Sequence, residues 1–189
     1  MRVESDEERK EEEYRFLKYY HVFNVEQTEG ITIPQREEKA PSDIIDEAEG
    51  FLSSLGATII FGKGYAAYQP NLDEILLPHP HTFTSMAAYY ATALHEHVHW
   101  SGHPSRLNRP LVSHRHVQEY AEEELVAELG AAFLCSHLQI PSRMREDHAA
   151  YIQSWIRVLH EDRRAIFKAS ALAQKAADYL RAKAGEEAV

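Results

Sequence analysis

The amino-acid sequence predicts an α+β fold in which a small antiparallel sheet packs on one central helix and the C-terminal half is helical. Three short β-rich runs lie between residues 57 and 77, separated by glycines and by a proline–asparagine turn. From residue 83 onwards, apolar residues recur every three to four positions, which is the spacing of a helix face. Hydrophobic residues make up 44% of the 189 positions, which is enough for a sizeable core.

The N-terminal region divides into a charged stretch and the start of the domain. Residues 1–13 are dense in acidic and basic side chains, which predicts a solvated arm. Residues 14–186 are then expected to form a single domain. An alternating, β-rich run at residues 19–25 predicts a strand, and the apolar stripe of residues 43–55 predicts a helix that Gly56 ends.

Three further strands are expected before the central helix. The runs 57–61, 65–68 and 74–77 are β-rich, and Pro70–Asp73 supplies the turn between the last two. An exposed edge of such a sheet can pair with an extended peptide through main-chain hydrogen bonds.

The rest of the chain is predicted to be helical. The first helix spans residues 83–100, and a glycine–histidine–proline run directly after it should stop it. Residues 117–138 read as one long helix, and residues 147–160 and 163–184 as two more.

The central helix carries the motif H-E-x-x-H. His95 and His99 lie four residues apart, so they stack one turn above each other and can hold one metal ion together. Glu96 is rotated by about 100° from His95, which places it beside the metal, where it can take a proton from water. This is the arrangement of zinc metallopeptidases, and a sheet followed by a metal-binding helix is the element order of zincin-type peptidases.

A zinc site with two histidines needs a third protein ligand. The longer pattern H-E-x-x-H-x-x-G-x-x-H fits through Gly102 and then fails, because residue 105 is serine. His103 would lie about 6 Å beyond His99 if the helix continued, so a role beside the ligands or towards the substrate is expected for it.

The helix at 117–138 offers better candidates for the third ligand. On a helical wheel Glu124 and Glu128 lie on one flank of the apolar stripe, one turn apart, whereas Glu123 points away from it and is expected to be solvated. A carboxylate at the edge of a buried face needs a partner. We expect Glu124 to bind the metal and Glu128 to accept the spare N–H of a metal-bound histidine; the reverse assignment stays open.

Composition limits the environment and the partners. The formal net charge is -10, so direct nucleic-acid binding is not expected. No apolar run approaches the roughly 18 residues of a membrane span, and no membrane contact is expected. The only cysteine is Cys135, and the charged N-terminus has no signal-peptide core; both features predict a cytoplasmic protein.

Several long motifs resemble one known family, the C-terminal zincin-like metallopeptidase domain of ArdC-type antirestriction proteins, which is also found in polyvalent proteins of phages and plasmids. The resemblance covers almost everything from residue 14 to residue 180. It rests on Tyr19–Gly30, Ala67–Pro78, Tyr89–Glu96, His99–Arg109, Tyr120–Leu129, Ala150–Trp155 and Ala176–Leu180.

The resemblance implies a zincin-like fold, a zinc cofactor, a peptide or protein substrate, and a place in antirestriction or mobile-element biology. Members of the family usually carry an N-terminal single-stranded DNA-binding domain. We do not expect such a domain within these residues, so we expect a separate DNA-binding domain or partner. One departure is His97, where the family usually has an apolar residue. It could compete for the metal or lie in solvent on the outer helix face.

Two functional hypotheses follow. In the first, Glu96 is the general base for peptide hydrolysis at zinc held by His95, His99 and Glu124, with Tyr68, Tyr120 or His103 as alternative oxyanion donors. In the second, the chain is a non-catalytic acidic interaction protein that inhibits a restriction or DNA-modifying enzyme, and zinc only holds the fold. A metal-free helical domain is a third, purely structural reading.

Overall fold

The computed structural model describes residues 24, 27–30, 41–111, 117–141, 155–156, 159–160 and 162–186. The chain divides into two compact units, residues 1–37 and residues 38–189. In the first, the amide of Gln27 donates to the carbonyl of Asn24 at 2.8 Å and closes a turn. The charged arm predicted for residues 1–13 lies outside the described residues, as does the strand predicted for 19–25 except Asn24, which is not in a strand.

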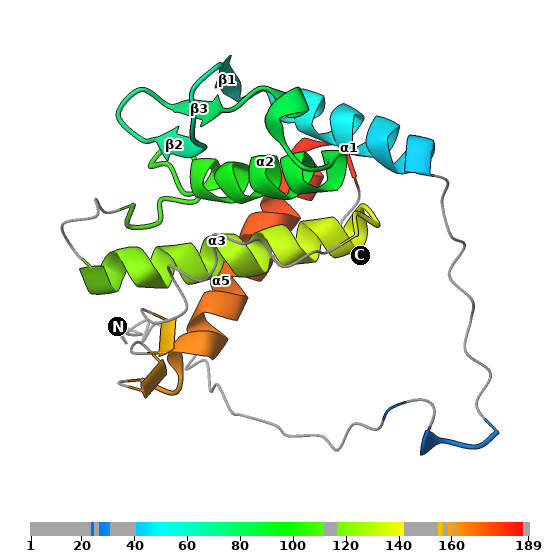
Figure 1. Cartoon of the computed structure of the whole chain (residues 1–189). Helices are drawn as coiled ribbons and strands as arrows, with labels where there is room; N and C mark the ends of the chain where they lie inside the picture. Colours follow the sequence, from blue (N-terminus) through cyan, green and yellow to red (C-terminus); the bar gives the residue numbers. More distant parts are fainter. Residues whose placement is uncertain are drawn as a thin grey trace, which may run out of the picture. The chain divides into compact units, whose positions relative to one another are not determined.

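The second unit contains the elements that form the core (Figure 1). They follow the predicted order closely: α1 (Pro41–Leu55), β1 (Thr58–Phe61), β2 (Ala67–Gln69), β3 (Glu74–Leu77), a 3-10 turn η2 (Pro80–Thr82), α2 (Met86–Ser101), α3 (Val117–His137) and α5 (Ala165–Lys183). Of the helix predicted for residues 147–160, only 155–156 and 159–160 are described, and they are helical.

The sheet is mixed, and the prediction of a fully antiparallel sheet is wrong for one strand pair. The strand order is β1-β3-β2; β2 pairs antiparallel with β3, whereas β1 runs parallel to β3. Burial accounts for the strand order. Ile75, Leu76 and Leu77 of β3 are all buried, as suits a central strand, whereas Ile60 and Phe61 of β1 are 37% and 43% exposed. The chain therefore forms β1 at one edge of the sheet, then β2 at the other edge, and then β3 between them. It reverses direction twice on the way, so β3 runs parallel to β1.

Helix α2 is the central element of this unit. Ser85 caps its N-terminus by accepting a hydrogen bond from the amide of Ala88 at 3.1 Å. Helices α1, α3 and α5 and strands β2 and β3 all contact it. Almost every side chain from Tyr89 to Ser101 is consequently buried, and the polar motif residues at 95–97 are buried with them.

Helix α3 packs against both α2 and α5, and α5 crosses behind it in Figure 1. Small residues of α5 allow the close approach, because Ala169, Ala173, Ala176 and Ala177 are all buried in the core. With helices on two sides, α3 buries five consecutive residues, 123–127. This arrangement brings the acidic residues of α3 against the histidines of α2.

Gly130 sets how closely α3 can approach α2. A Cβ atom there would lie 2.9 and 3.0 Å from the two methyl groups of the buried Val98. We expect Gly130→Ala to lower the free energy of unfolding by about 1–3 kcal/mol relative to Gly50→Ala, because overpacking a filled core costs that much. Denaturant unfolding of both variants measures the difference.

Gly50 is the matched control because it also lies in a helix, α1, and a Cβ atom there would meet no side chain beyond its chain neighbours, and no backbone outside its own helix, within 4 Å. Alanine there should stabilise the protein by about 0.5–1 kcal/mol. Equal stability of the two variants would show that α2 and α3 can move apart without cost.

Candidate metal centre

Two histidines of α2 and one glutamate of α3 bring their donor atoms together. The Nε2 atoms of His95 and His99 lie 3.2 Å apart. One carboxylate oxygen of Glu124 is 3.5 Å from Nε2 of His95, and the other is 3.4 Å from Nε2 of His99. All three donor atoms lie within 4.8 Å of one another, and His95 and Glu124 are buried. We call these three residues the ligand cluster.

The ligand cluster stabilises positive charge. Burial opposes a charge on His99, but its hydrogen bonds with Glu123 and Glu124 outweigh burial and raise its pKa. Burial likewise opposes ionisation of Glu124, yet hydrogen bonds from the two histidines lower its pKa below the usual range. A divalent cation can replace the protons that these groups share, and two imidazoles with a carboxylate are a donor set that transition metals accept. The residues therefore fit a metal.

The other ring nitrogens of both histidines also face carboxylates. Nδ1 of His95 lies 3.2 Å from an oxygen of Glu128, within ion-pair distance although not in good hydrogen-bond geometry. Nδ1 of His99 lies 3.2 Å from an oxygen of Glu123. Glu128 thus occupies the place expected for a carboxylate that accepts the spare N–H of a ligand histidine.

The expectation of a solvated Glu123 is wrong. Only 8% of this residue is exposed, and Arg109 holds its carboxylate with two hydrogen bonds of 3.1 and 2.8 Å. A helical wheel assumes one solvent face, whereas α3 is covered on two sides and the loop before it covers more. The signal in the sequence is Arg109, a basic residue in the loop between the two helices, which can pair with a carboxylate of α3.

Glu96 is 5% exposed and follows His95 on α2. Within the described part of the chain, its carboxylate makes no hydrogen bond or ion pair. Burial lowers the pKa of His95, but hydrogen bonds with Glu124 and Glu128 outweigh it and raise the pKa, and the charge of Glu96 adds to this rise. Glu96 therefore lies near the ligand cluster with a carboxylate that is not committed to a described partner.

His103 lies outside the ligand cluster. Its Nδ1 contacts the hydroxyl of Ser105 at 2.7 Å in the loop after α2. Nearby, Arg106 stacks on Trp100 at 3.9 Å and donates to Asp73. These contacts tie the β2–β3 turn to the end of α2.

Tyr68 belongs to the same set of contacts. Its hydroxyl donates to Asp73 at 2.8 Å and accepts from Arg106 at 3.2 Å. Burial and the Asp73 carboxylate raise the pKa of Tyr68 above its usual value. The hydroxyl of Tyr68 therefore holds the β2–β3 turn in place, and its hydrogen is not available to donate to an oxyanion.

Comparison with known proteins agrees with this geometry. Residues 46–172 match the family of zincin-like metallopeptidases, which is more than half of the chain. The chain belongs to the zincin-like metallopeptidase family. Its zincin-like fold and the predicted resemblance to ArdC-type proteins are confirmed by the solved structures that follow.

Two crystal structures of the antirestriction protein ArdC from plasmid R388 are similar to this zincin-like chain. The Mn(II)-bound structure has a TM-score of 0.71 and 43% identity, over 87% of this chain and 62% of ArdC. The metal-free structure has a TM-score of 0.69 and 40% identity, over 88% of this chain and 61% of ArdC.

Related sequences include longer proteins. Protein y4eC of Sinorhizobium fredii is 40% identical over 178 residues, which are 94% of this chain and 58% of y4eC. DNA primase TraC of Escherichia coli is 44% identical over 160 residues, which are 84% of this chain and 15% of TraC. The zincin-like chain therefore spans less than two thirds of these relatives.

His97 occupies neither of the places that the sequence left open. It is fully buried, its Nδ1 lies 2.6 Å from the carbonyl oxygen of Ala93, and its ring packs against that of Trp100. It is not among the described residues that converge on the possible metal position. Burial lowers its pKa from 6.5 to about 4, so in the folded zincin-like domain His97 is a neutral core residue near neutral pH.

We expect His97→Leu to reduce the loss of stability in acid. Between pH 6.5 and pH 4 the unfolded chain binds a proton at residue 97 that the folded chain excludes, so stability falls as the pH falls. The wild type should lose about 2 to 3 kcal/mol more than the variant between pH 7 and pH 4.5. Urea unfolding of both proteins at each pH, in the presence of a chelator, measures this difference in stability. Titrating groups that the two proteins share contribute equally to both and cancel. Parallel pH profiles would contradict it.

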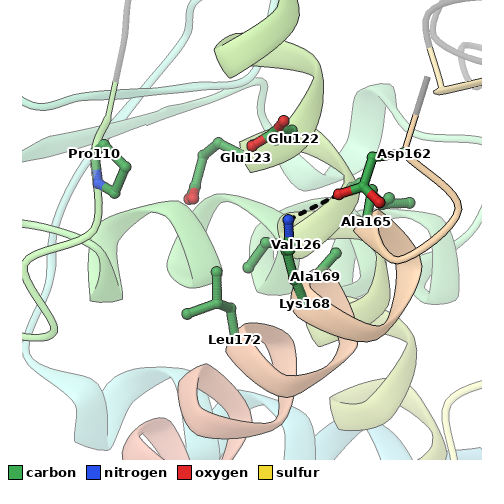
Figure 2. Close-up of a pocket in the computed structure, with 10 residues that line it drawn as sticks. Pro110, Glu122, Glu123, Val126, Asp162, Ala165, Lys168, Ala169 and Leu172 are labelled. Atoms are coloured by element: carbon green, nitrogen blue, oxygen red, sulfur yellow. Dashed lines mark hydrogen bonds and ion pairs between the residues drawn. The ribbon is translucent and has the colours of Figure 1, made fainter. Parts of the chain in front are cut away.

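A cavity of about 310 Å³ lies between α3 and α5, beside Pro110 (Figure 2). Its wall is mainly aliphatic, with Glu122 and Glu123 on one side and the ion pair of Lys168 with Asp162, 2.7 Å long, on the other. No member of the ligand cluster is among the described residues that line it. Among the described residues that line the cavity, Glu123 is the one that contacts a histidine of the ligand cluster.

Among the described residues, no helix is both long enough and apolar enough to cross a membrane.

Proposed function

We propose that this chain is a metal-dependent peptidase module that hydrolyses peptide bonds at the ligand cluster. The observation that supports this most is that Nε2 of His95, Nε2 of His99 and the Glu124 carboxylate converge within 4.8 Å, with Glu96 next to them on α2. Family membership and the Mn(II)-bound structure of ArdC support the binding of a metal by this chain.

His95, His99 and Glu124 would hold the metal. We propose zinc, although imidazole and carboxylate donors also accept other transition metals, and manganese is the metal in the ArdC structure. When bound, a divalent metal acidifies water and polarises a carbonyl oxygen.

Glu96 supplies the proton transfers. Its carboxylate takes a proton from the attacking water and passes it to the leaving amine, as a general base and then a general acid. The burial of Glu96 keeps this transfer away from bulk solvent. Tyr120 and His103 remain the candidates for the oxyanion donor, because the Tyr68 hydroxyl is bonded to Asp73 and Arg106.

The substrate we propose is an extended peptide segment. Strand β2 is an edge of the sheet and contacts α2, so a peptide paired with this edge would run beside the helix that carries the ligands. The similarity to ArdC and TraC supports a role in antirestriction or plasmid biology, with DNA binding supplied by another domain or partner.

A non-catalytic role is the second candidate, and the net charge of -10 favours it. An acidic surface could occupy the DNA-binding face of a restriction or modification enzyme. In that case the metal would only stabilise the fold.

Metal removal tests the peptidase proposal. Protein loaded with zinc or manganese should cleave members of a mixed peptide library, and the chelator-treated protein should not, with products identified by mass spectrometry. Activity should return when the metal is added back. Equal cleavage with and without metal would point to a contaminating protease, and no cleavage by metal-loaded protein would favour the acidic interaction protein.

A further inference from the structure

A buried arginine, Arg109, forms hydrogen bonds with several residues on the His99 side of the metal centre. Its Nε and Nη2 donate to the two carboxylate oxygens of Glu123 at 3.1 and 2.8 Å. Its Nη2 and Nη1 also donate to the carbonyl of Val98 at 2.6 Å and the hydroxyl of Ser101 at 3.0 Å. Arg109 and Glu123 are 6% and 8% exposed. The loop after α2, the last turn of α2 and the first half of α3 thus meet at one guanidinium.

The oxygen of Glu123 that accepts from Nη2 of Arg109 also faces Nδ1 of His99, at 3.2 Å. If Nδ1 of His99 carries a hydrogen that it donates to Glu123, its Nε2 has a free lone pair directed at the ligand cluster. We propose that Glu123 and Arg109 are positioning residues that fix the tautomer and orientation of His99 for metal binding. This rests on the proposed metal site.

Arginine is needed in this place because its planar fork fixes both carboxylate oxygens at once, which a lysine ammonium cannot do. Without it, Glu123 would be a buried carboxylate free to rotate about its last bond. Gly102 supports the same arrangement, since a Cβ atom at that position would lie 2.9 Å from Nη2 of Arg109. The glycine after the H-E-x-x-H motif therefore makes room for the guanidinium.

The arrangement gives the two ligand histidines different supports. His95 faces Glu128, whose side chain is 15% exposed, whereas His99 faces Glu123, which also accepts two hydrogen bonds from the buried Arg109.

The test compares Glu123→Gln with Glu122→Gln, its exposed neighbour on α3. Zinc affinity is measured by competition with a chromophoric chelator. Loss of a partner that orients a ligand histidine typically weakens metal binding by about 10–100-fold, so we expect this for Glu123→Gln and no change for Glu122→Gln. Arg109→Lys should also weaken binding, and Arg109→Lys combined with Glu123→Gln should be no worse than Glu123→Gln alone, because the two act through one contact.

Glu123→Asp keeps the charge beside Arg109 but shortens the reach to His99, so it tests positioning even where Glu123→Gln folds poorly. It should weaken zinc binding as well. Wild-type affinity in Glu123→Gln or Glu123→Asp, or additive losses in the double variant, would overturn the inference.

Nuclear magnetic resonance of protein labelled with nitrogen-15 in histidine separates this inference from the metal proposal. A slowly exchanging Nδ1–H of His99 should be present in the wild type, with or without zinc, and absent from Glu123→Gln. If the wild type binds no zinc but shows this proton, the proposed function fails and the contact stands. If the proton is missing from the wild type, the inference is wrong.

Discussion

Glu124→Ala should strip the protein of tightly bound metal, whereas Glu128→Ala should only weaken binding. In the structure the Glu124 carboxylate faces Nε2 of both histidines, at 3.5 and 3.4 Å, whereas Glu128 faces Nδ1 of His95 alone. Losing an outer partner costs about 10–100-fold in affinity, and losing a ligand should cost more than that. His95→Ala should behave like Glu124→Ala.

Elemental analysis of tag-free protein measures the metal directly. We expect close to one metal ion per chain in the wild type, none in the His95 and Glu124 variants, and a reduced content in Glu128→Ala. Circular dichroism of each variant checks that the helices persist, and Glu122→Ala serves as the control for an exposed glutamate on the same helix. Metal retained in Glu124→Ala would transfer the third-ligand role to Glu128 or His103.

The parts of the site that the sequence predicted are those that depend on local spacing. His95, Glu96 and His99 lie on one turn of a single helix, so their relation follows from helix geometry alone. The placing of Glu124 and Glu128 one turn apart is equally local. What brings them to the histidines is the packing of α3 on α2, and a buried carboxylate's need for a partner was enough to anticipate it.

The parts that the sequence did not predict depend on tertiary context. Glu123 was expected in solvent because a helical wheel shows one helix alone, whereas Glu123 is buried against His99 of α2 and Arg109 of the loop after α2. His97 was expected at the metal or in solvent for the same reason, and it is buried against Trp100. The parallel pairing of β1 with β3 depends on which strand becomes central, and that is decided by what packs over the sheet.

Glu96→Gln should abolish peptide hydrolysis while leaving the metal in place. The substitution keeps the size of the side chain but removes the group that accepts a proton, and general base catalysis contributes about 10²–10⁴-fold to a rate. Glu96 is not part of the ligand cluster, so metal content should match that of the wild type. Initial rates of cleavage of one identified peptide, together with elemental analysis of the same samples, measure both quantities.

The same variant separates the two functional hypotheses. Glu122→Gln removes one negative charge from the same protein at an exposed position, so it reports the effect of charge alone. If inhibition of a restriction or modification enzyme depends on hydrolysis, Glu96→Gln should lose it and Glu122→Gln should keep it. Acidic competition would instead survive both substitutions, since each leaves most of the net charge of -10 in place. Inhibition that persists in metal-loaded Glu96→Gln would therefore refute the catalytic account and leave the metal with a structural role.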